Sequence, residues 1–417
     1  MAGNADGAAD HGVTALTADT SVSPDLKHGK LSLPEVLAQS VANMAPSAAM
    51  ALLPLLVFAG AGNGTWVSFT IALLALLCIG YCAAQFARRI NSAGSFYVWV
   101  SKALRPSLGH AAGWGLILGY LATGMATVYG FAIYGSDLLT RLGAPDNRAI
   151  LVALFLLDTL LAAGVAFLDI GLSARTSLIL ESISVVIILI LCVNIWVHNG
   201  TVFDTHQLTL AGVKPGGILG STAPLPDLAT HTGIGGFAYV LDIGIISSMF
   251  ACTLACINAG SRLIYSMARD GMGHSTMGSV HRARNTPHIA IAVAAVPMIA
   301  VPIVTTIMNQ AAVNATGWVG SIATFGFMLG YALVGIGAPV FLRRVGAPAM
   351  LSWILGLLGA AIMVFVFWAN WLPQTIPGNL FPPLTGAYIW LPYIFLGWTA
   401  IAMCGVLRTR CTLPMVE

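Results

Sequence analysis

The sequence predicts an all-α protein, a bundle of ten helices that spans a membrane, and three observations lead to this prediction. Of the 417 residues, 58% are hydrophobic and only 8% are charged, whereas a soluble domain carries about 25% charged residues. The apolar residues gather into ten separate windows, each about as long as a helix that crosses a bilayer. Lysine and arginine fall mostly on one side of the topology that these windows define. A bilayer accommodates this composition because lipid solvates outward-facing apolar side chains.

The ten predicted spans share a length of about 20 residues and a low content of charge. They cover residues 41–61, 66–86, 111–139, 149–168, 177–197, 237–263, 289–307, 318–342, 350–371 and 387–406. The third is longer than a bilayer needs, which indicates a tilted helix or an extra turn outside the membrane. Residues 91–110 are too polar to cross, and the aromatic residues Phe96, Tyr97 and Trp99 beside Lys102 predict an amphipathic helix at the interface.

The positive charges predict the orientation, because cytoplasmic loops are enriched in lysine and arginine. Ten spans place both termini on one side, and that side receives fifteen of the eighteen lysine and arginine residues. The opposite side receives Arg141, Arg148 and Lys214. We therefore expect both termini in the cytoplasm, with a disordered tail at residues 1–35, one transmembrane domain at 36–410 and a short tail at 411–417.

The first predicted span contains two prolines, Pro46 and Pro54, which interrupt helical hydrogen bonding. A helix broken in lipid needs a cavity, a ligand or neighbouring helices for its exposed backbone groups. Transporters place such breaks near mid-membrane, where a half-helix N-terminus meets an anionic group. We predict a binding site at the break, formed by Met44, Ala45, Pro46, Ser47 and Ala48. A simple proline kink is the alternative.

Three acidic residues lie within predicted spans, where an ionisable side chain is expensive and often functional. Glu181 lies about one turn inside its span, and its sequence neighbours offer no counter-charge. Protonation is the least costly way to keep such a residue in the membrane, so we predict Glu181 as a proton-coupling residue. For Asp158 and Asp242 we expect capped or water-facing carboxylates.

The sequence lacks the motifs typical of an enzyme, a metal site or a nucleotide site. Its seven cysteines form no C-x-x-C pair, which argues against zinc and for packing residues in helices. No glycine cluster is followed by the Lys-Ser/Thr of a phosphate loop, and no nucleophile elbow or H-E-x-x-H motif occurs. We therefore expect no enzymatic activity, no metal, no cofactor and no nucleic-acid partner, and transport driven by an H⁺ or Na⁺ gradient.

Two longer stretches resemble a known family. Residues 86–120 read FARRINSAGSFYVWVSKALRPSLGHAAGWGLILGY, and residues 254–273 read LACINAGSRLIYSMARDGMG, followed by HRARNTPHIAI. These stretches, with the Ala-Pro-Ser-Ala break in the first span, are similar to the signature regions of the amino acid–polyamine–organocation permeases. The resemblance covers nearly the whole chain after residue 30 and implies a five-plus-five inverted repeat with two further helices. It implies secondary active transport of amino acids or related amines.

The resemblance also implies further site residues. In the family, helices one, three, six, eight and ten form the substrate site, and helix one corresponds to the break described above. Position by position, helix three supplies Tyr120, Gly124 and Thr127, and helix eight supplies Thr253 and Cys256. Ordinary helix packing is the alternative role for these five residues. The lack of a charged side chain at the break favours a neutral amino acid over a polyamine.

The chain departs from the family in having about ten spans instead of twelve. Residues 199–236 offer no apolar window of about 20 residues, and they stand where the family's sixth and seventh helices are expected. Helix six is the repeat partner of helix one, so its loss removes half of the expected site. A transport-inactive remnant or scaffold is therefore the alternative function, and a second copy in a homo-oligomer is one way to fill the gap. Fourteen arginines against four lysines indicate a GC-rich bacterial genome, and hence a bacterial cytoplasmic membrane.

Overall fold

The computed structural model describes residues 33–90, 95–168, 170–199, 223–376 and 384–410. Within these ranges all regular elements are helices, and ten segments are long and apolar enough to span a membrane. The predicted all-α bundle with ten spans is therefore confirmed. The predicted tails lie almost entirely outside the described residues, which begin at 33 and end at 410.

The helices follow the predicted windows and extend most of them by a few residues. Their bounds are α2 (Leu33–Met44), α3 (Pro46–Ala61), α4 (Thr65–Ala87), α5 (Phe96–Ala103), α6 (Pro106–Arg141), α7 (Arg148–Leu168), α8 (Ile170–Asn199), α9 (Pro224–His231), α10 (Phe237–Arg269), α11 (His288–Ile307), α12 (Ala312–Arg344), α13 (Met350–Trp371) and α14 (Leu391–Arg410). Short 3₁₀ turns supplement them at Gly62–Gly64, Ser275–Gly278, Pro373–Thr375 and Gly386–Ile389.

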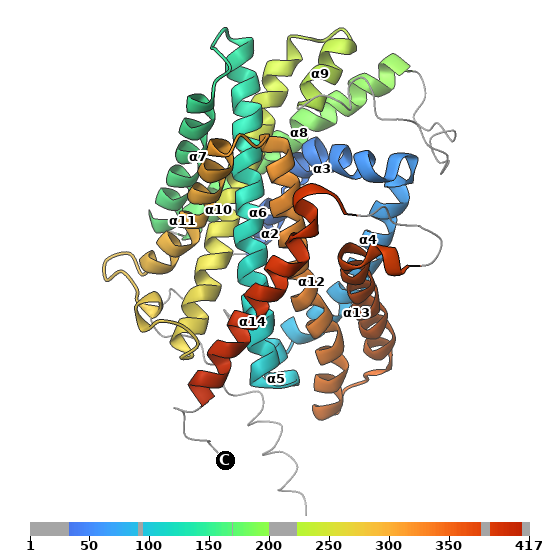
Figure 1. Ribbon diagram of the computed structural model, residues 1–417, viewed down its shortest axis with the longest axis vertical. Coiled ribbons are helices and arrows are strands. Elements are labelled where there is room, and N and C mark those ends of the chain that lie inside the picture. The colour runs from blue at the N-terminus through green and yellow to red at the C-terminus, as the bar shows by residue number, and fades with distance from the viewer. Residues whose placement is uncertain (1–32, 91–94, 169, 200–222, 377–383, 411–417) are drawn as a thin grey trace, which may run out of the picture.

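Three long helices, α6, α10 and α12, form the centre of the bundle (Figure 1). Most of their length is buried in protein, whereas α4, α7, α8 and α13 are mostly exposed, as helices that face lipid are. The predicted extra length of the third span is confirmed, because α6 has 36 residues. At 1.5 Å per residue it is about 54 Å long, well beyond the hydrocarbon thickness of about 30 Å.

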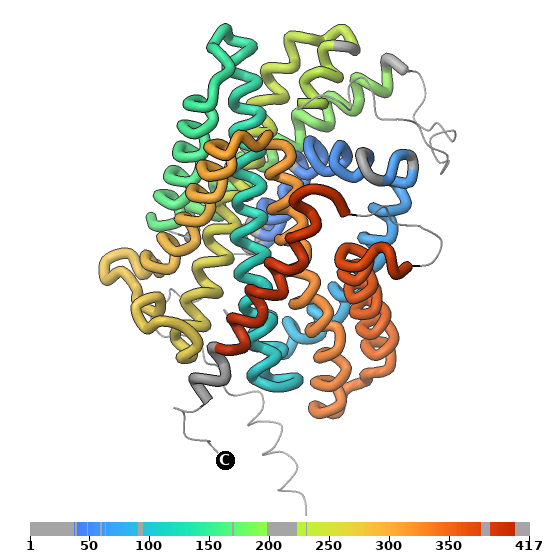
Figure 2. The backbone as a smooth tube through the Cα atoms, in the orientation of Figure 1, coloured from blue at the N-terminus to red at the C-terminus, as the bar shows by residue number. Residues whose placement is uncertain are grey.

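The first predicted span is not one continuous helix. α2 ends at Met44, α3 begins at Pro46, and Ala45 between them adopts the left-handed conformation at φ 45° and ψ 60°. Figures 1 and 2 show that α3 lies across the direction of α6. The predicted break is therefore confirmed, and it turns the chain sideways inside the bundle. Pro54 lies within α3 without ending it.

The segment between the second and third spans contains the predicted short helix, α5, at residues 96–103. Much of this helix is buried against the bundle, including Tyr97, Val98 and Trp99, while its position at the membrane interface stays a prediction. The Trp99 ring stacks on Phe86 with 5.6 Å between ring centroids. The Tyr97 hydroxyl donates a hydrogen bond to Asp270 Oδ2 at 2.8 Å. Burial and the negative charge of Asp270 together raise the pKa of Tyr97.

Glycines set the distance between the two helices α6 and α12. A Cβ atom on Gly115 would lie 2.9 Å from the Gly326 carbonyl oxygen, and one on Gly326 would lie 2.8 Å from the Gly119 backbone nitrogen. These neighbours are backbone atoms, which cannot move aside as a flexible side chain does. Small residues therefore allow the two helices to pack closely at this crossing.

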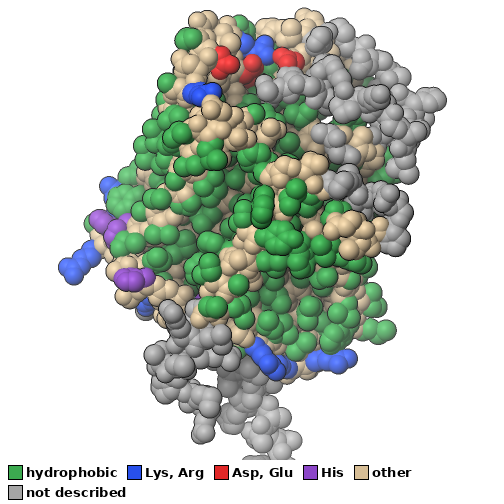
Figure 3. Space-filling model, in the orientation of Figure 1, with side chains coloured by type: hydrophobic (Ala, Val, Ile, Leu, Met, Phe, Trp, Pro, Cys, Tyr) green, Lys and Arg blue, Asp and Glu red, His purple; other side chains and the backbone are tan. Residues whose placement is uncertain are grey.

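An ion-pair cluster closes the end of the bundle that lies opposite the C-terminus (Figures 1 and 3). Arg141 of α6 contacts Asp137 at 2.7 Å, Asp227 of α9 at 3.0 Å and Asp242 of α10 at 3.6 Å. Asp242 was expected to be capped or to face water; its side chain is fully buried, so it does not face water, and Arg141 is its partner. In the described part of 199–236, α9 is a short helix of eight residues and does not span. The cluster thus attaches this segment to α6 and α10.

Candidate functional site

The break between α2 and α3 is stabilised from the side by α8. The backbone N–H of Ser47 and its hydroxyl both donate to Glu181 Oε1, at 3.3 Å and 3.2 Å. Both side chains are almost fully buried. The first N–H groups of a helix have no partner within the helix, and its N-terminus favours negative charge. Glu181 therefore occupies part of the anion-binding position that the sequence assigned to a ligand.

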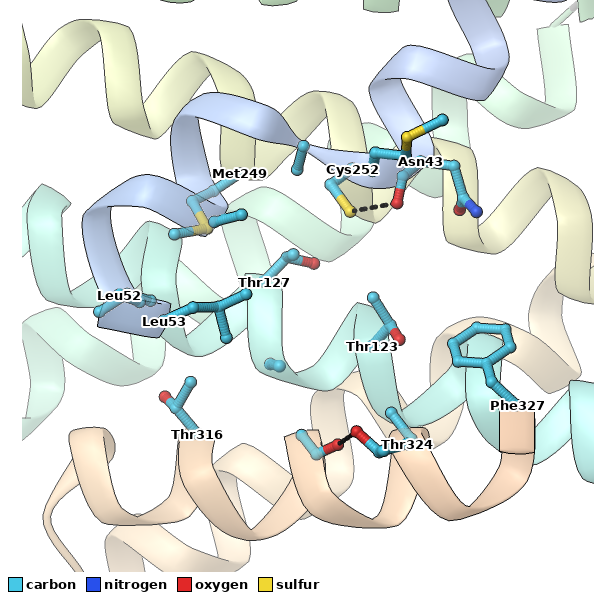
Figure 4. Close-up of a pocket in the computed structure, with 16 residues that line it drawn as sticks. Asn43, Leu52, Leu53, Thr123, Thr127, Met249, Cys252, Thr316, Thr324 and Phe327 are labelled. Carbon is cyan, nitrogen blue, oxygen red and sulfur yellow. Dashed lines mark hydrogen bonds between the residues drawn. The ribbon is translucent and has the colours of Figure 1, made fainter. Parts of the chain in front are cut away.

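A cavity of about 220 Å³ lies on the other side of the break. Figure 4 shows it between α3 and α12, with Thr123 and Thr127 of α6 beside it. Its lining comes from α2, α3, α6, α10 and α12, and none of the described lining residues is charged. The polar lining side chains are Asn43, Thr123, Thr127, Thr316 and Thr324. This volume lies below the range of about 300–1,000 Å³ typical of sites for drug-sized ligands, so it suits a small ligand such as one amino acid.

The residues predicted at the break divide between the two sides. Met44 and Ala45 line the cavity, whereas Ser47 faces Glu181 and does not. Pro46 is the first residue of α3 and fixes the start of that helix. Ala48 lies in the first turn of α3, and its side chain is outside the described part of the structure. The break thus brings together two of the five predicted residues at the cavity.

The predicted residues of α6 have different surroundings. Thr127 lines the cavity, but Tyr120 and Gly124 do not. Tyr120 packs edge-on against the lining residue Phe327, with 5.3 Å between ring centroids. Gly124 faces α10 and α11, where a Cβ atom would lie 3.4 Å from Cβ of Cys256 and closer still to Met298. Its small size serves packing in this structure.

The predicted residues of α10 lie just behind the cavity wall. Thr253 is fully buried, and its hydroxyl is 2.9 Å from the hydroxyl of Thr127. Cys256 donates a hydrogen bond to Asn43 Oδ1 at 3.6 Å. Its neighbour one turn earlier, Cys252, donates to the Asn43 backbone oxygen at 3.7 Å and does line the cavity (Figure 4). These contacts hold the end of α2 against α10.

Asp158 was expected to be capped or to face water, and the structure shows the first alternative. Its side chain is fully buried, and its Oδ2 accepts a hydrogen bond of 2.9 Å from the hydroxyl of Thr253. The expected capping is therefore present, but the carboxyl group has no exposure to water. Asp158 lies ten residues from each end of α7, which is about 15 Å at 1.5 Å per residue. It therefore stands at the middle of its span.

The resemblance implied a contribution from the helix that corresponds to α12, but sequence reasoning named none of its residues. Thr316, Gly320 and Thr324 line the cavity and follow one another at intervals of four residues. That spacing puts them on one helix face, so a polar and small stripe in an apolar span was a usable signal. Asn43 was missed as well, although it directly precedes the predicted site.

Comparison with known proteins identifies the family. The family model described as amino acid permease matches residues 31–226 and 207–398, which together cover most of the chain. The chain belongs to the amino acid permease family. It is therefore a multi-pass membrane protein of a transporter family and not an enzyme, and the family implies an amino acid substrate.

The permease is similar to several bacterial proteins at low identity. It is 22% identical over 302 residues to the branched-chain amino acid permease BcaP of Bacillus subtilis, covering 55% of the permease but only 65% of BcaP, less than two thirds of its length. It is 22% identical over 392 residues to an uncharacterized transporter of Mycobacterium tuberculosis, covering 82% and 87% of the two chains. An uncharacterized transporter of Rhizobium meliloti is 38% identical over 82 residues, covering 19% of the permease and 18% of that protein.

Proposed function

We propose that this permease is a secondary active transporter that binds one amino acid in the cavity beside the α2–α3 break. The observation that carries the proposal is the position of the cavity, which lies at a broken helix between α6, α10 and α12. On the prediction that the family's helices six and seven are absent before α10, these elements correspond in order to helices one, three, eight and ten of the family. Broken helices at substrate sites are typical of transporters of this kind.

The cavity chemistry favours a small neutral amino acid. Its polar groups are an amide and four hydroxyls, and the rest of its lining is apolar, including Leu52, Met249 and Phe327. Such groups hydrogen-bond the polar end of a substrate and pack against an uncharged side chain. Similarity to a protein named a branched-chain amino acid permease supports the same class of substrate. The substrate's carboxylate and ammonium group then face the hydroxyl and amide groups.

We further propose that Glu181 couples transport to protons, with Na⁺ as the alternative coupling ion. The Glu181 carboxyl group binds the first turn of α3 through Ser47, and Ser248 of α10 is another hydrogen-bonding neighbour. Hydrogen bonds to an ionised acceptor are about twice as strong as neutral ones. Protonation of Glu181 therefore weakens the contact between α8 and α3, directly beside the backbone turn at Ala45. This supports a link between proton binding and movement of α3.

A second candidate function is a membrane protein without transport activity, and the short middle of the chain favours it. The 392 positions aligned with the Mycobacterium tuberculosis transporter include 82% of the 417 residues, or about 342. About 50 aligned positions are therefore gaps in this chain, roughly the length of two spanning helices with a loop. The two family-model matches meet at residues 207–226, within the segment where helices six and seven are expected. These facts support an internal loss of the second broken helix.

Uptake by liposomes that contain the purified chain separates the two candidates. We expect labelled neutral amino acids to enter under an inward proton gradient, and Gly320→Leu to reduce uptake by at least about tenfold. Gly320 lines the cavity and has nothing within 4 Å of an added Cβ, so a larger side chain there begins without a clash and occupies substrate space. A tenfold loss corresponds to only about 1.4 kcal/mol of binding.

Gly164→Leu is the matched control, because Gly164 of α7 is exposed, lies outside the cavity and also has nothing within 4 Å of an added Cβ. Equal uptake by both variants and the unaltered chain contradicts the cavity as the substrate site. No uptake from well-folded protein favours the transport-inactive alternative.

We also propose the predicted orientation, with both termini in the cytoplasm of a bacterium. Lys102, Arg269 and Arg343 end helices at the same end of the bundle as the C-terminus, whereas Arg141 ends α6 at the other (Figures 1 and 3). An excess of positive charge marks the cytoplasmic side. A green fluorescent protein fused to the C-terminus should fluoresce in bacteria, and a fused alkaline phosphatase should be inactive. The reverse result contradicts this orientation.

A further inference from the structure

A buried acid lies behind the cavity wall and is connected to it by two hydroxyl groups. Thr253 Oγ1 is 2.9 Å from Asp158 Oδ2 and 2.9 Å from Thr127 Oγ1, and Thr127 lines the cavity. Asp158 and Thr253 are fully buried, so neither exchanges its hydrogen bonds with bulk water. The second carboxyl oxygen, Asp158 Oδ1, is buried without a hydrogen-bond partner in the described structure. Such a group in mid-span calls for an explanation beyond packing.

The protonation state of Asp158 determines whether each of the two threonine hydroxyls donates or accepts in this chain of hydrogen bonds. An ionised Asp158 only accepts hydrogen bonds, so Thr253 donates to it and can accept from Thr127. The lone pairs of Thr127 that remain then face the cavity and suit a donor such as an ammonium group. A protonated Asp158 can donate to Thr253, whose hydrogen then turns to Thr127 or to the Met249 carbonyl, 3.1 Å away. Thr127 is then released to donate its own hydrogen to the cavity or to the Gly124 carbonyl at 3.0 Å.

We propose that Asp158 is a proton-binding site whose occupancy reverses the direction of the Thr253 and Thr127 hydroxyls and so changes how the cavity binds its substrate. The proposal rests on the proposed function of the cavity and adds to it a second acid besides Glu181. The proton is held by Asp158 Oδ2 or Oδ1, and the carboxylate returns when the proton leaves. The step needs no oxidant, metal or partner.

The surroundings of Asp158 fit a site that responds to protons. From α10, Cys252 lies close enough to both Asp158 and Glu181 to interact electrostatically with each. From α6, Tyr129 packs edge-on against Phe155 of α7, and its hydroxyl is paired with Thr305 of α11. From α8, Glu181 lies on the other side of Cys252. The titratable residue of α11 is His288, which is the first residue of that helix. A cation that would hold Asp158 permanently ionised is not found among these neighbours in the described structure.

Infrared spectroscopy of the full chain in lipid nanodiscs tests proton binding without requiring transport. On acidification we expect a carboxylic acid C=O band that is absent from Asp158→Asn and retained in Glu181→Gln. We expect Thr253→Val to shift the frequency of this band, because the carboxyl group loses its hydroxyl partner, and Thr253→Ser to restore it. Thr159→Val is the matched control, since Thr159 is the next residue of α7 and its buried hydroxyl has no hydrogen-bond partner in the described structure.

The proposal is overturned if the C=O band persists in Asp158→Asn. It is also overturned if Thr253→Val leaves the frequency of the band as unchanged as Thr159→Val does. The second measurement is binding of labelled L-leucine at acidic and alkaline pH. Reversal of one hydrogen bond changes affinity by roughly 2- to 10-fold, and we expect Asp158→Asn and Thr127→Val to reduce the pH dependence of leucine affinity by this factor. Leucine affinity that stays equally pH-dependent in Asp158→Asn also overturns it. If the unaltered chain binds no leucine, the infrared result alone decides the proton site, and the uptake experiment with several neutral amino acids decides the proposed function.

Discussion

Glu181→Ala is expected to lower the free energy of unfolding by about 3 kcal/mol and to abolish transport. The substitution leaves the Ser47 N–H buried without an acceptor, which costs about 1–3 kcal/mol, and it opens a cavity where the carboxyl group was. It also removes the attachment of α3 to α8 at the helix break. An unfolding titration with sodium dodecyl sulfate measures the first effect, and uptake by liposomes measures the second.

Glu181→Gln separates the structural role of this residue from proton coupling. Glutamine keeps an oxygen that accepts the Ser47 hydrogen bonds but cannot titrate, so we expect a loss of only about 1 kcal/mol together with uptake that no longer responds to a proton gradient. Ser184→Ala is the control on the same helix, because its buried hydroxyl has no hydrogen-bond partner in the described structure. An unchanged gradient response in Glu181→Gln removes Glu181 from coupling, and a stable Glu181→Ala contradicts its structural role.

Gly326→Ala is expected to force α6 and α12 apart and to destabilise the bundle by about 1–3 kcal/mol. The new Cβ would meet the Gly119 backbone nitrogen at 2.8 Å and lie still closer to the Gly115 carbonyl oxygen. Since α6 and α12 both line the cavity, separation of the two helices also alters the substrate site. We expect a lower unfolding temperature and weaker amino acid uptake.

Gly80→Ala provides the comparison for this substitution. Gly80 of α4 also lies within a spanning helix, but an added Cβ there meets nothing within 4 Å. Alanine has the higher helix propensity, so this variant should be as stable as the unaltered chain or slightly more stable. Equal unfolding temperatures for the two variants would show that the α6–α12 crossing tolerates an added methyl group.

The spans were predictable because the bilayer imposes a length and an apolar composition on each helix separately. The break was predictable for a similar local reason, since Pro46 alone forbids the preceding helical hydrogen bond. The direction that α3 takes after the break was not predictable. Its apolar residues surround the helix on all sides, so the sequence does not say which neighbour it packs against.

The candidate site was only partly predictable because its key contacts join distant parts of the chain. Ser47 and Glu181 were predicted separately, as ligand-binding and proton-coupling residues, but they are 134 residues apart and nothing local links them. Asp158 was expected to be capped or to face water, because its partner Thr253 lies 95 residues further along. A buried acid differs from a solvated one only through such partners, which the linear sequence does not reveal.

The ion-pair cluster at Arg141 has a consequence for the order of events during biosynthesis. Asp137 lies four residues before Arg141 on α6, but Asp227 follows 86 residues later. At a synthesis rate of about 5–20 residues per second, the ribosome needs about 4–17 s to reach Asp227. During that interval α6 inserts with its arginine neutralised by its own helix alone. Only after translation has passed α9 and the start of α10 do the remaining carboxylates arrive and close this end of the bundle.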